Sequence, residues 1–295
     1  MKVRIGIGTG GEQQAPAELE AMCGAILEHG FDSIWISEIL SRPGLDPLVA
    51  LAWLSGRLPG LKIGTTFLVP GRNVLRLARQ LASLDHLSGG RLLLTAVPGL
   101  PRGGERTAVG VDPKGRGRLI EDTLPVLRSL LAGEPTDVPG PFGTTREVVL
   151  DPVPVQQPLE FWLGGSLPSA LDRCGRVGDG WLPAMITPED CGSGRTRIDE
   201  VAAEHGRTID PEHFGVSIGY SAAPLPDAVL VALEARAGGA DLSRVVPVGP
   251  VAVRELLEAY LEVGFSKFVL RPIVPPTSWP GELEALAGVV EGLQT

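Results

Sequence analysis

The chain has 295 residues, of which 43% are hydrophobic, and a formal net charge of −9. This length and apolar content suit one large domain over residues 1–295, since α/β barrels use about 250 residues as a single unit. The acidic balance and the absence of any block of Lys or Arg exclude nucleic acid and anionic membranes as expected partners.

Short apolar runs alternate with helical patterns along most of the chain. The apolar runs predict strands at residues 3–8, 33–37, 62–67, 91–97, 160–164, 181–182, 214–220 and 267–271. Apolar residues at helical spacing predict helices at residues 16–28, 47–58, 74–88, 119–130, 168–177, 191–205, 225–237, 251–262 and 282–293. The two patterns follow each other as strand and helix through most of the sequence.

Several residues mark where helices begin and end. Asp46 and Asn73 are expected N-caps, because their side chains can accept a hydrogen bond from the first helical turn. Gly30 and the pair Gly89-Gly90 are expected helix stops. Residues 133–158 depart from the rhythm and form an insertion region with one strand-like run at 147–150.

The predicted strands are mostly too apolar to alternate between a buried and a solvated face. Parallel strands that are buried on both faces have this character, and eight right-handed strand–helix units close into a barrel. We therefore predict an α/β fold, a (β/α)8 TIM barrel. The alternative is an open doubly wound sheet, which would favour a G-x-G-x-x-G turn after the first strand. Gly6, Gly8 and Gly11 match that spacing, but Gly6 lies inside the predicted strand and not in the turn after it.

The three cysteines, Cys23, Cys174 and Cys191, form no C-x-x-C pair. A disulfide framework or a zinc site is not expected, no metal is assigned, and the pattern suits a reducing compartment. The chain lacks the apolar stretch of a signal peptide, and no run reaches the roughly 18 apolar residues of a membrane span. We expect a cytoplasmic protein without a membrane partner.

The sharpest chemical feature is the turn Gly164-Gly165-Ser166, between a predicted strand and a predicted helix. Glycines let backbone N–H groups approach an anion, Ser166 adds a hydroxyl, and the helix N-terminus attracts phosphate. The alternative is an ordinary tight turn. In a barrel, chemistry lies at the carboxyl ends of the strands, and this turn follows such an end.

Other candidates lie at further strand ends. Glu38 could accept a hydrogen bond from a cofactor ring or act as a base, or it could pair with Arg42 at the rim. Thr65 and Thr66 could offer hydroxyls, or they could reflect β-propensity alone. Arg271 could hold an anionic group or form a salt bridge in the barrel wall. The histidines lie at helix ends or before a strand and are expected to be structural; they are His29, His86, His205 and His213.

Longer stretches carry a family resemblance from end to end and in order. They are residues 30–38, 46–51, 81–92, 161–183 and 263–272, which include Leu-Asp-His-Leu-Ser-Gly-Gly-Arg at 84–91 and Gly-Asp-Gly-Trp-Leu-Pro at 178–183. With these stretches the sequence resembles the luciferase-like monooxygenase superfamily. Within it, the chain is similar to the actinobacterial oxidoreductases that depend on the deazaflavin coenzyme F420.

The resemblance implies a cofactor site. It places the cofactor phosphate on Gly164, Gly165 and Ser166 and sets Glu38 against the cofactor ring. It implies a non-proline cis peptide bond at Gly64–Thr65 that would support a bent ring. It also implies a homodimer. Fold logic completes the candidate set at the strand ends, with Gly8, Thr66, Pro98 and Gly99 toward the cofactor and Leu100, Met185 and Arg271 toward a substrate.

Two departures from the family pattern limit the chemistry. Sugar-phosphate dehydrogenase relatives carry a histidine directly after the acidic residue, where this chain has Ile39. They also carry a glutamate after the fourth strand, where this chain has Leu100. Both proton donors of those relatives are missing. We do not expect oxidation of a sugar phosphate, and Glu38 is the one candidate catalytic residue.

Three functions compete. The first is hydride transfer between F420 and a small, apolar organic substrate. The second is an FMN monooxygenase that uses reduced flavin and oxygen, and the third is a non-catalytic flavin- or deazaflavin-binding protein. A long anionic tail of F420 needs a basic groove, and five residues could form one, which favours the deazaflavin: Arg102, Arg106, Lys114, Arg116 and Arg118.

Overall fold

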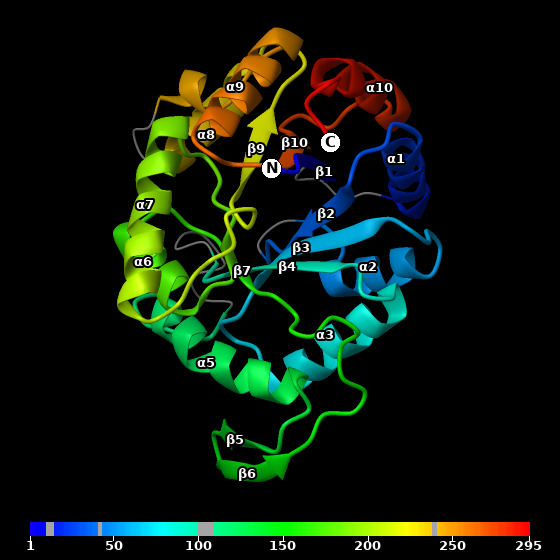
Figure 1. Ribbon diagram of the computed structural model, residues 1–295. Helices are drawn as coiled ribbons and strands as arrows, with labels where there is room; N and C mark the ends of the chain where they lie inside the picture. Colours follow the sequence, from blue (N-terminus) through cyan, green and yellow to red (C-terminus); the bar gives the residue numbers. More distant parts are fainter. Residues whose placement is uncertain (10–14, 41–42, 100–108, 238–240) are drawn as a thin grey trace. The chain divides into compact units, whose positions relative to one another are not determined.

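The computed structural model describes residues 1–9, 15–40, 43–99, 109–237 and 241–295 (Figure 1). The chain divides into two compact units. The first unit comprises Met1–Trp35 and Leu163–Thr295, and the second unit comprises Ile36–Trp162. Each unit has its own strands and its own helices. Among the described residues, no helix combines the length and the apolar character that crossing a membrane requires.

The first unit contains most of the parallel strands. Its strands are β1 (Arg4–Gly8), the beginning of β2 (Ser33–Ser37), the end of β7 (Trp162–Leu163), β8 (Gly180–Trp181), β9 (Gly215–Tyr220) and β10 (Lys267–Pro272). Its helices are α1 (Pro16–Glu28), α6 (Pro168–Val177), α7 (Pro188–Glu204), α8 (Asp227–Ala237), the short η1 (Leu242–Arg244), α9 (Pro250–Glu262) and α10 (Trp279–Val290). Helices α6 and α7 lie side by side, as do α1 and α10 (Figure 1).

The second unit pairs β3 (Lys62–Leu68) with β4 (Leu92–Val97) in parallel, with Thr66 opposite Thr95. Its helices are α2 (Pro47–Ser55), α3 (Val74–Ser88) and α5 (Arg116–Leu131). It also holds an antiparallel hairpin of β5 (Thr136–Gly140) and β6 (Gly143–Val148). Helix α3 packs against both α2 and α5.

The strand order is that of a barrel. Hydrogen-bonded neighbours follow each other as β8-β7-β4-β3-β2-β1-β10-β9. The two outer members of this order also meet, because parallel bridges join Trp181 to Phe214 and Ala184 to Ser217. An open doubly wound sheet would leave both outer strands unpaired on one side. The order and the bridges therefore confirm the predicted (β/α)8 TIM barrel.

The predicted helix boundaries follow from the expected caps. The Asp46 side chain accepts a hydrogen bond from the Val49 N–H at 3.0 Å, and Asn73 does the same for Arg76 at 3.0 Å. Gly89 ends α3 in the left-handed conformation with φ 66°. Helix α2 ends at Ser55, before Leu58, so the predicted range was too long there.

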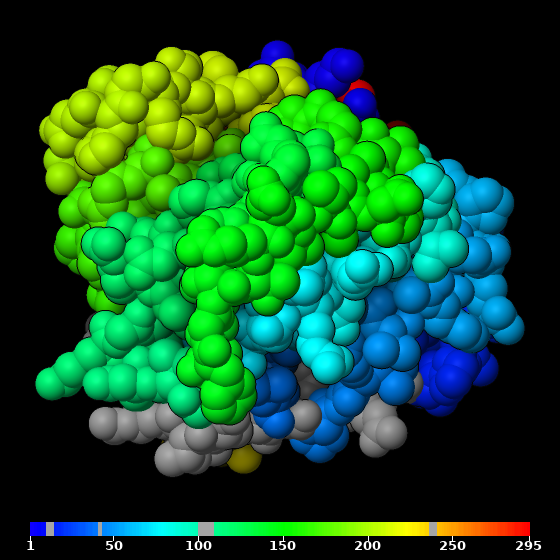
Figure 2. All heavy atoms as spheres, turned by 90° about the horizontal axis from the view of Figure 1, so that it is seen from below, coloured from blue at the N-terminus to red at the C-terminus, as the bar shows by residue number. Residues whose placement is uncertain are grey.

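The insertion region 133–158 differs from the prediction. It holds a two-stranded hairpin, whereas the sequence predicted one strand-like run at 147–150. The sequence did not indicate the first strand, because Pro139 argues against a strand. Proline is nevertheless tolerated in a strand that has a free edge. Both strands of a two-stranded hairpin have such an edge. The hairpin lies at the surface (Figure 2, green), and Phe142 in its turn is fully exposed.

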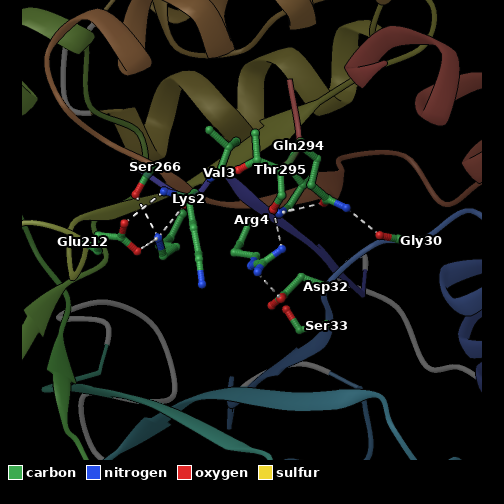
Figure 3. A network of polar contacts seen from close by, with 12 residues as sticks. Lys2, Val3, Arg4, Gly30, Asp32, Ser33, Glu212, Ser266, Gln294 and Thr295 are labelled. Carbon is green, nitrogen blue, oxygen red and sulfur yellow. Dashed lines mark hydrogen bonds and ion pairs between the residues drawn. The ribbon is translucent and has the colours of Figure 1, made fainter. Parts of the chain in front are cut away.

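The amino ends of the strands in the first unit are held by a polar network (Figure 3). The Val3 N–H donates to Thr295 Oγ1 at 3.0 Å, and the Ile5 N–H donates to Gln294 Oε1 at 3.1 Å. Lys267 at the start of β10 pairs with Glu212 at 3.2 Å. The amino end of a TIM barrel serves stability, and chemistry lies at the opposite end.

A second polar network involves Asp85 and Arg91, which belong to the stretch 81–92 of the family resemblance. The carboxylate of Asp85, which has no exposed surface, accepts from the Gln156 N–H at 2.9 Å and from Gln156 Nε2 at 2.7 Å. The Arg91 guanidinium donates to the main-chain oxygens of Ser55, Leu58 and Leu61. These two residues join distant segments of the second unit, so their role is to hold the fold.

Candidate functional site

The turn after β7 is held in a conformation that requires glycine. Gly165 adopts φ 100°, a conformation that residues with a side chain rarely take. Its carbonyl oxygen accepts from Trp181 Nε1 at 2.8 Å, which holds the turn in place. Residues 165–169 are exposed, whereas Gly164 is buried. The turn is therefore rigid and open to solvent at once.

Helix α6 begins directly after this turn without a capping side chain. Leu167 occupies the N-cap, makes no side-chain hydrogen bond, and is followed by Pro168 at the first helical position. The start of a helix carries a partial positive charge. Pro168 has no N–H, and Ala170 donates its N–H to the Leu167 carbonyl oxygen at 2.7 Å, so the helix itself leaves the N–H groups of Leu167 and Ser169 unbonded. With the Ser166 hydroxyl beside them, these groups suit a phosphate. A phosphate site at the turn Gly164-Gly165-Ser166 therefore stays a prediction.

A second feature of the first unit lies at the ends of β1, β9 and β10. Arg271 Nε donates to Ser217 Oγ at 2.8 Å. A Cβ atom on Gly8 would lie 2.5 Å from both Cγ and Nη1 of Arg271, so the arginine crosses β1 where that strand has no side chain. Desolvation lowers the pKa of Arg271 to about 10, and the guanidinium therefore stays charged at neutral pH. A salt bridge in the barrel wall, the alternative that the sequence left open for Arg271, does not form with any described carboxylate.

Met185 stands out by its backbone. Its φ of 56° is one of two positive values among the described residues other than glycine. It packs against a small apolar cluster of the first unit that also receives Ile273; the buried members are Leu225, Leu233, Val245 and Val246. Strained backbone of this kind costs of order 1–3 kcal/mol and gathers at functional sites.

In the second unit, Glu38 has a partner that the sequence did not indicate. Its Oε1 accepts from Arg72 Nη2 at 2.6 Å, and its Oε2 accepts from the Leu68 N–H at 2.7 Å. The side chain of Glu38 is 7% exposed. Arg42, the partner considered from sequence, lies outside the described residues. Both oxygens of Glu38 are thus engaged, so the carboxylate positions the end of β3.

We expect Glu38→Gln to lower the free energy of unfolding by roughly 2–4 kcal/mol, because breaking a buried ion pair leaves Arg72 uncompensated. Urea unfolding followed by tryptophan fluorescence measures this. A cycle with Arg72→Met separates the pair from the individual side chains. Strictly additive effects of the two substitutions would contradict the assigned pairing.

The two threonines of β3 point to opposite sides of the strand. Successive side chains of a strand alternate, and Thr66 shares a face with Thr95 on β4. Thr65 is fully buried, and its hydroxyl has no hydrogen-bond partner. The hydroxyl of Thr95 is equally buried and also lacks a partner. Thr65 and Thr66 therefore cannot serve one ligand together, and Thr95 joins Thr66 as a candidate that the sequence did not suggest.

The expected cis peptide bond at Gly64–Thr65 was wrong. The cis bonds among the described residues precede Pro152 and Pro158. Gly64 and Thr65 instead continue the ladder of β3, opposite Leu93 and Leu94 of β4. A strand that keeps its regular register leaves no room for the distortion that the family resemblance implied.

The segment after β4 bears on the choice of cofactor. Pro98 and Gly99 are partly buried, Gly99 has φ 81°, and Leu100 lies outside the described residues. Arg116 is 2% exposed and therefore lines no surface groove. Arg118 pairs with Asp122 at 2.9 Å. The predicted basic groove loses Arg116, while Arg102 and Arg106 lie outside the described residues.

The cysteines sit in the core. All three are buried and free. Burial raises the pKa of Cys23 to about 12 and raises the pKa values of Cys174 and Cys191 as well. A thiol must lose its proton to act as a nucleophile, so these residues pack rather than react.

Fold and site together define a class of protein. It is a TIM barrel in which a glycine turn follows β7 and leads directly into α6, a helix without a capping side chain. A family model described as luciferase-like monooxygenase matches residues 1–260. The chain therefore belongs to the luciferase-like monooxygenase family.

Three curated relatives are 27% to 28% identical to the chain over the segments that match. An F420-dependent glucose-6-phosphate dehydrogenase of Beutenbergia cavernae is 28% identical over 70% of this chain and 65% of its own length. A 5,10-methylenetetrahydromethanopterin reductase of Methanolobus tindarius is 27% identical over 64% of the chain and 56% of its own length. A limonene 1,2-monooxygenase of Rhodococcus erythropolis is 27% identical over 65% and 52%. The chain thus spans less than two thirds of each.

Solved structures share the fold along the whole chain. An F420-dependent secondary alcohol dehydrogenase superposes with a TM-score of 0.83 at 17% identity, covering 100% of both chains. The coenzyme F420-dependent tetrahydromethanopterin reductase of Methanopyrus kandleri superposes with a TM-score of 0.79 at 19% identity, again over 100% of both chains. At this identity the likeness shows the fold alone.

Proposed function

We propose that the protein is an oxidoreductase that transfers a hydride between coenzyme F420 and a small organic substrate. The observation that carries the proposal is the turn Gly164-Gly165-Ser166, which is exposed, left-handed at Gly165 and followed by an uncapped helix. The F420-dependent relatives support the choice of cofactor. Residence in the cytoplasm and assembly as a homodimer belong to the same proposal.

The residues present fit such a cofactor. The turn would hold its phosphate through N–H groups and the Ser166 hydroxyl. When bound, the deazaflavin supplies a ring carbon that gives or accepts the hydride. The role of the protein is then to bind, to orient and to exclude water.

The chain provides few groups for moving a proton. Ile39 and Leu100 replace the donors of the sugar-phosphate dehydrogenases, and the carboxylate of Glu38 is engaged by Arg72 and a backbone N–H. This supports a substrate whose reaction needs little acid help from the protein. The sugar phosphates of the dehydrogenase relatives fit this site poorly.

The second candidate is a monooxygenase that uses reduced FMN and oxygen. Two observations favour it: the limonene monooxygenase relative, and the burial of Arg116 together with the pairing of Arg118. FMN needs the phosphate turn alone, whereas the anionic tail of F420 gains from a basic groove. A third candidate, a non-catalytic carrier of flavin or deazaflavin, would bind without turnover.

Isothermal titration of the protein with F420 and, separately, with FMN decides between these cofactors. We expect F420 to bind with a Kd of about 1 μM or tighter, near −8 kcal/mol, and FMN to bind more weakly. Tighter binding of FMN would move the proposal to oxygen-dependent chemistry. Failure of both to bind would remove the enzyme assignment. Binding without turnover, tested with oxidised F420 and organic hydride donors and with reduced F420 and organic acceptors, would favour the carrier.

A further inference from the structure

The ends of β9 and β10 carry an accessible face with one charged group on it. Ser217, Gly219 and Arg271 are partly exposed, whereas their neighbours Val216, Ile218 and Leu270 are buried. In the register of the two strands, Arg271 lies opposite Gly219, with Ser217 two residues back on the same face. The accessible face is therefore the one from which Arg271 extends.

Space around the guanidinium is kept open by glycine on both flanking strands. Gly8 on β1 lies against the arginine side chain, and a methyl group there would come within 2.5 Å of Nη1. Gly219 on β9 presents no side chain opposite Arg271. The two strands next to Arg271 therefore each carry a glycine beside its side chain, which leaves space for the guanidinium.

The hydrogen bonds of Arg271 leave one edge of the guanidinium available. Nε donates to Ser217 Oγ, which fixes the plane of the group. Among the described residues, no carboxylate pairs with Nη1 or Nη2. Removing an arginine from water, even in part, is costly without an ion pair. The planar guanidinium suits the recognition of carboxylates and phosphates. The two Nη groups match the two oxygens of a carboxylate.

We propose that Arg271 binds the carboxylate of an organic-acid substrate. The single positive charge balances a carboxylate, whereas a phosphate carries about −1.5 to −2 at neutral pH and would need further cations. Ile273 lies beside Gly219, since a Cβ there would meet its side chain at 3.2 Å, so an apolar body fits next to the acid group. This assignment deepens the proposed function and rests on it for the reaction.

Binding of paired acids and amides tests the assignment without any cofactor. Saturation-transfer NMR would compare acetate, benzoate and 2-naphthoate with their neutral amides on the wild type and on Arg271→Gln. We expect at least one acid to bind about tenfold or more tightly than its amide, and the preference to vanish in the variant. Arg254→Gln, on α9, where the 41% exposed side chain pairs with Glu258, is the matched control and keeps the preference.

Two further variants keep the test independent of folding defects. Ser217→Ala removes the hydrogen bond that Arg271 Nε donates, and Gly8→Ala displaces the guanidinium. Both variants retain the arginine. Each should reduce the preference for the acid over its amide several-fold. Equal binding of every acid and its amide would overturn the proposal. So would an unchanged preference in Arg271→Gln.

Titration with F420 separates this proposal from the proposed function. We expect wild type and Arg271→Gln to bind F420 equally. Loss of F420 binding in the variant would make Arg271 a cofactor residue and overturn its substrate role. If the wild type does not bind F420 but still prefers acids over their amides, the proposed cofactor is wrong and the carboxylate site at Arg271 is supported.

Discussion

Gly165→Asp is expected to weaken binding of F420 by about 100-fold or more, equivalent to roughly 2.7 kcal/mol or more. Two physical effects add. A side chain at φ 100° is strained, and its Cβ would lie 3.1 Å from the Cβ of Ala170. The new carboxylate would also occupy the helix start that the phosphate needs, and it would repel the phosphate. Isothermal titration measures the loss.

Gly206→Asp is the matched control for this prediction. Gly206 also has a positive φ, of 66°, is exposed, and has open space where a Cβ would be. It follows α7 and precedes β9, so it lies at the amino end of the strands. The control carries the same charge change at another exposed glycine of positive φ, and it should bind F420 as the wild type does. Equal weakening in both variants would mean that the turn after β7 has no special role.

Asp85→Asn is expected to lower the free energy of unfolding by roughly 2–4 kcal/mol. The substitution replaces one of two buried oxygens that accept hydrogen bonds with an NH2 group, which can only donate. Gln156 presents its N–H and its Nε2 to the two oxygens of Asp85. In the variant, the new NH2 group faces one of these donors. Urea unfolding, followed by far-ultraviolet circular dichroism, measures the change in midpoint.

Asp122→Asn serves as the control for Asp85. It breaks a pair with Arg118 on the surface of α5, in which both side chains are at least half exposed. Exposed pairs within one helix contribute about 0.3–0.5 kcal/mol, so a small change is expected. A loss at Asp85 no larger than that at Asp122 would refute the structural role assigned to the Asp85 network.

Features that depend on neighbouring residues were predictable. The caps at Asp46 and Asn73 and the stop at Gly89 were confirmed, since a cap is a contact over three or four residues. All eight barrel strands were predicted near their observed positions. The hairpin strand Thr136–Gly140 was missed, because its pairing, rather than its composition, makes it a strand.

Partners far apart in the sequence could not be predicted. Glu38 pairs with Arg72, 34 residues away, and Arg271 is held by Ser217, 54 residues away. No spacing rule connects such residues, because the strand register decides which side chains meet. The same register separates Thr65 from Thr66 and brings Thr95 beside Thr66.

By itself, the sequence determined the alternation of apolar strands and amphipathic helices, and with it the barrel and the glycine turn behind β7. These follow from local periodicity and from backbone freedom at single residues. The tertiary structure alone decided that Glu38 is engaged by Arg72 and that Arg271 extends beside Gly8 with no carboxylate partner among the described residues. The reason is physical: the charge state and availability of a side chain depend on groups that only the folded chain brings within hydrogen-bonding distance.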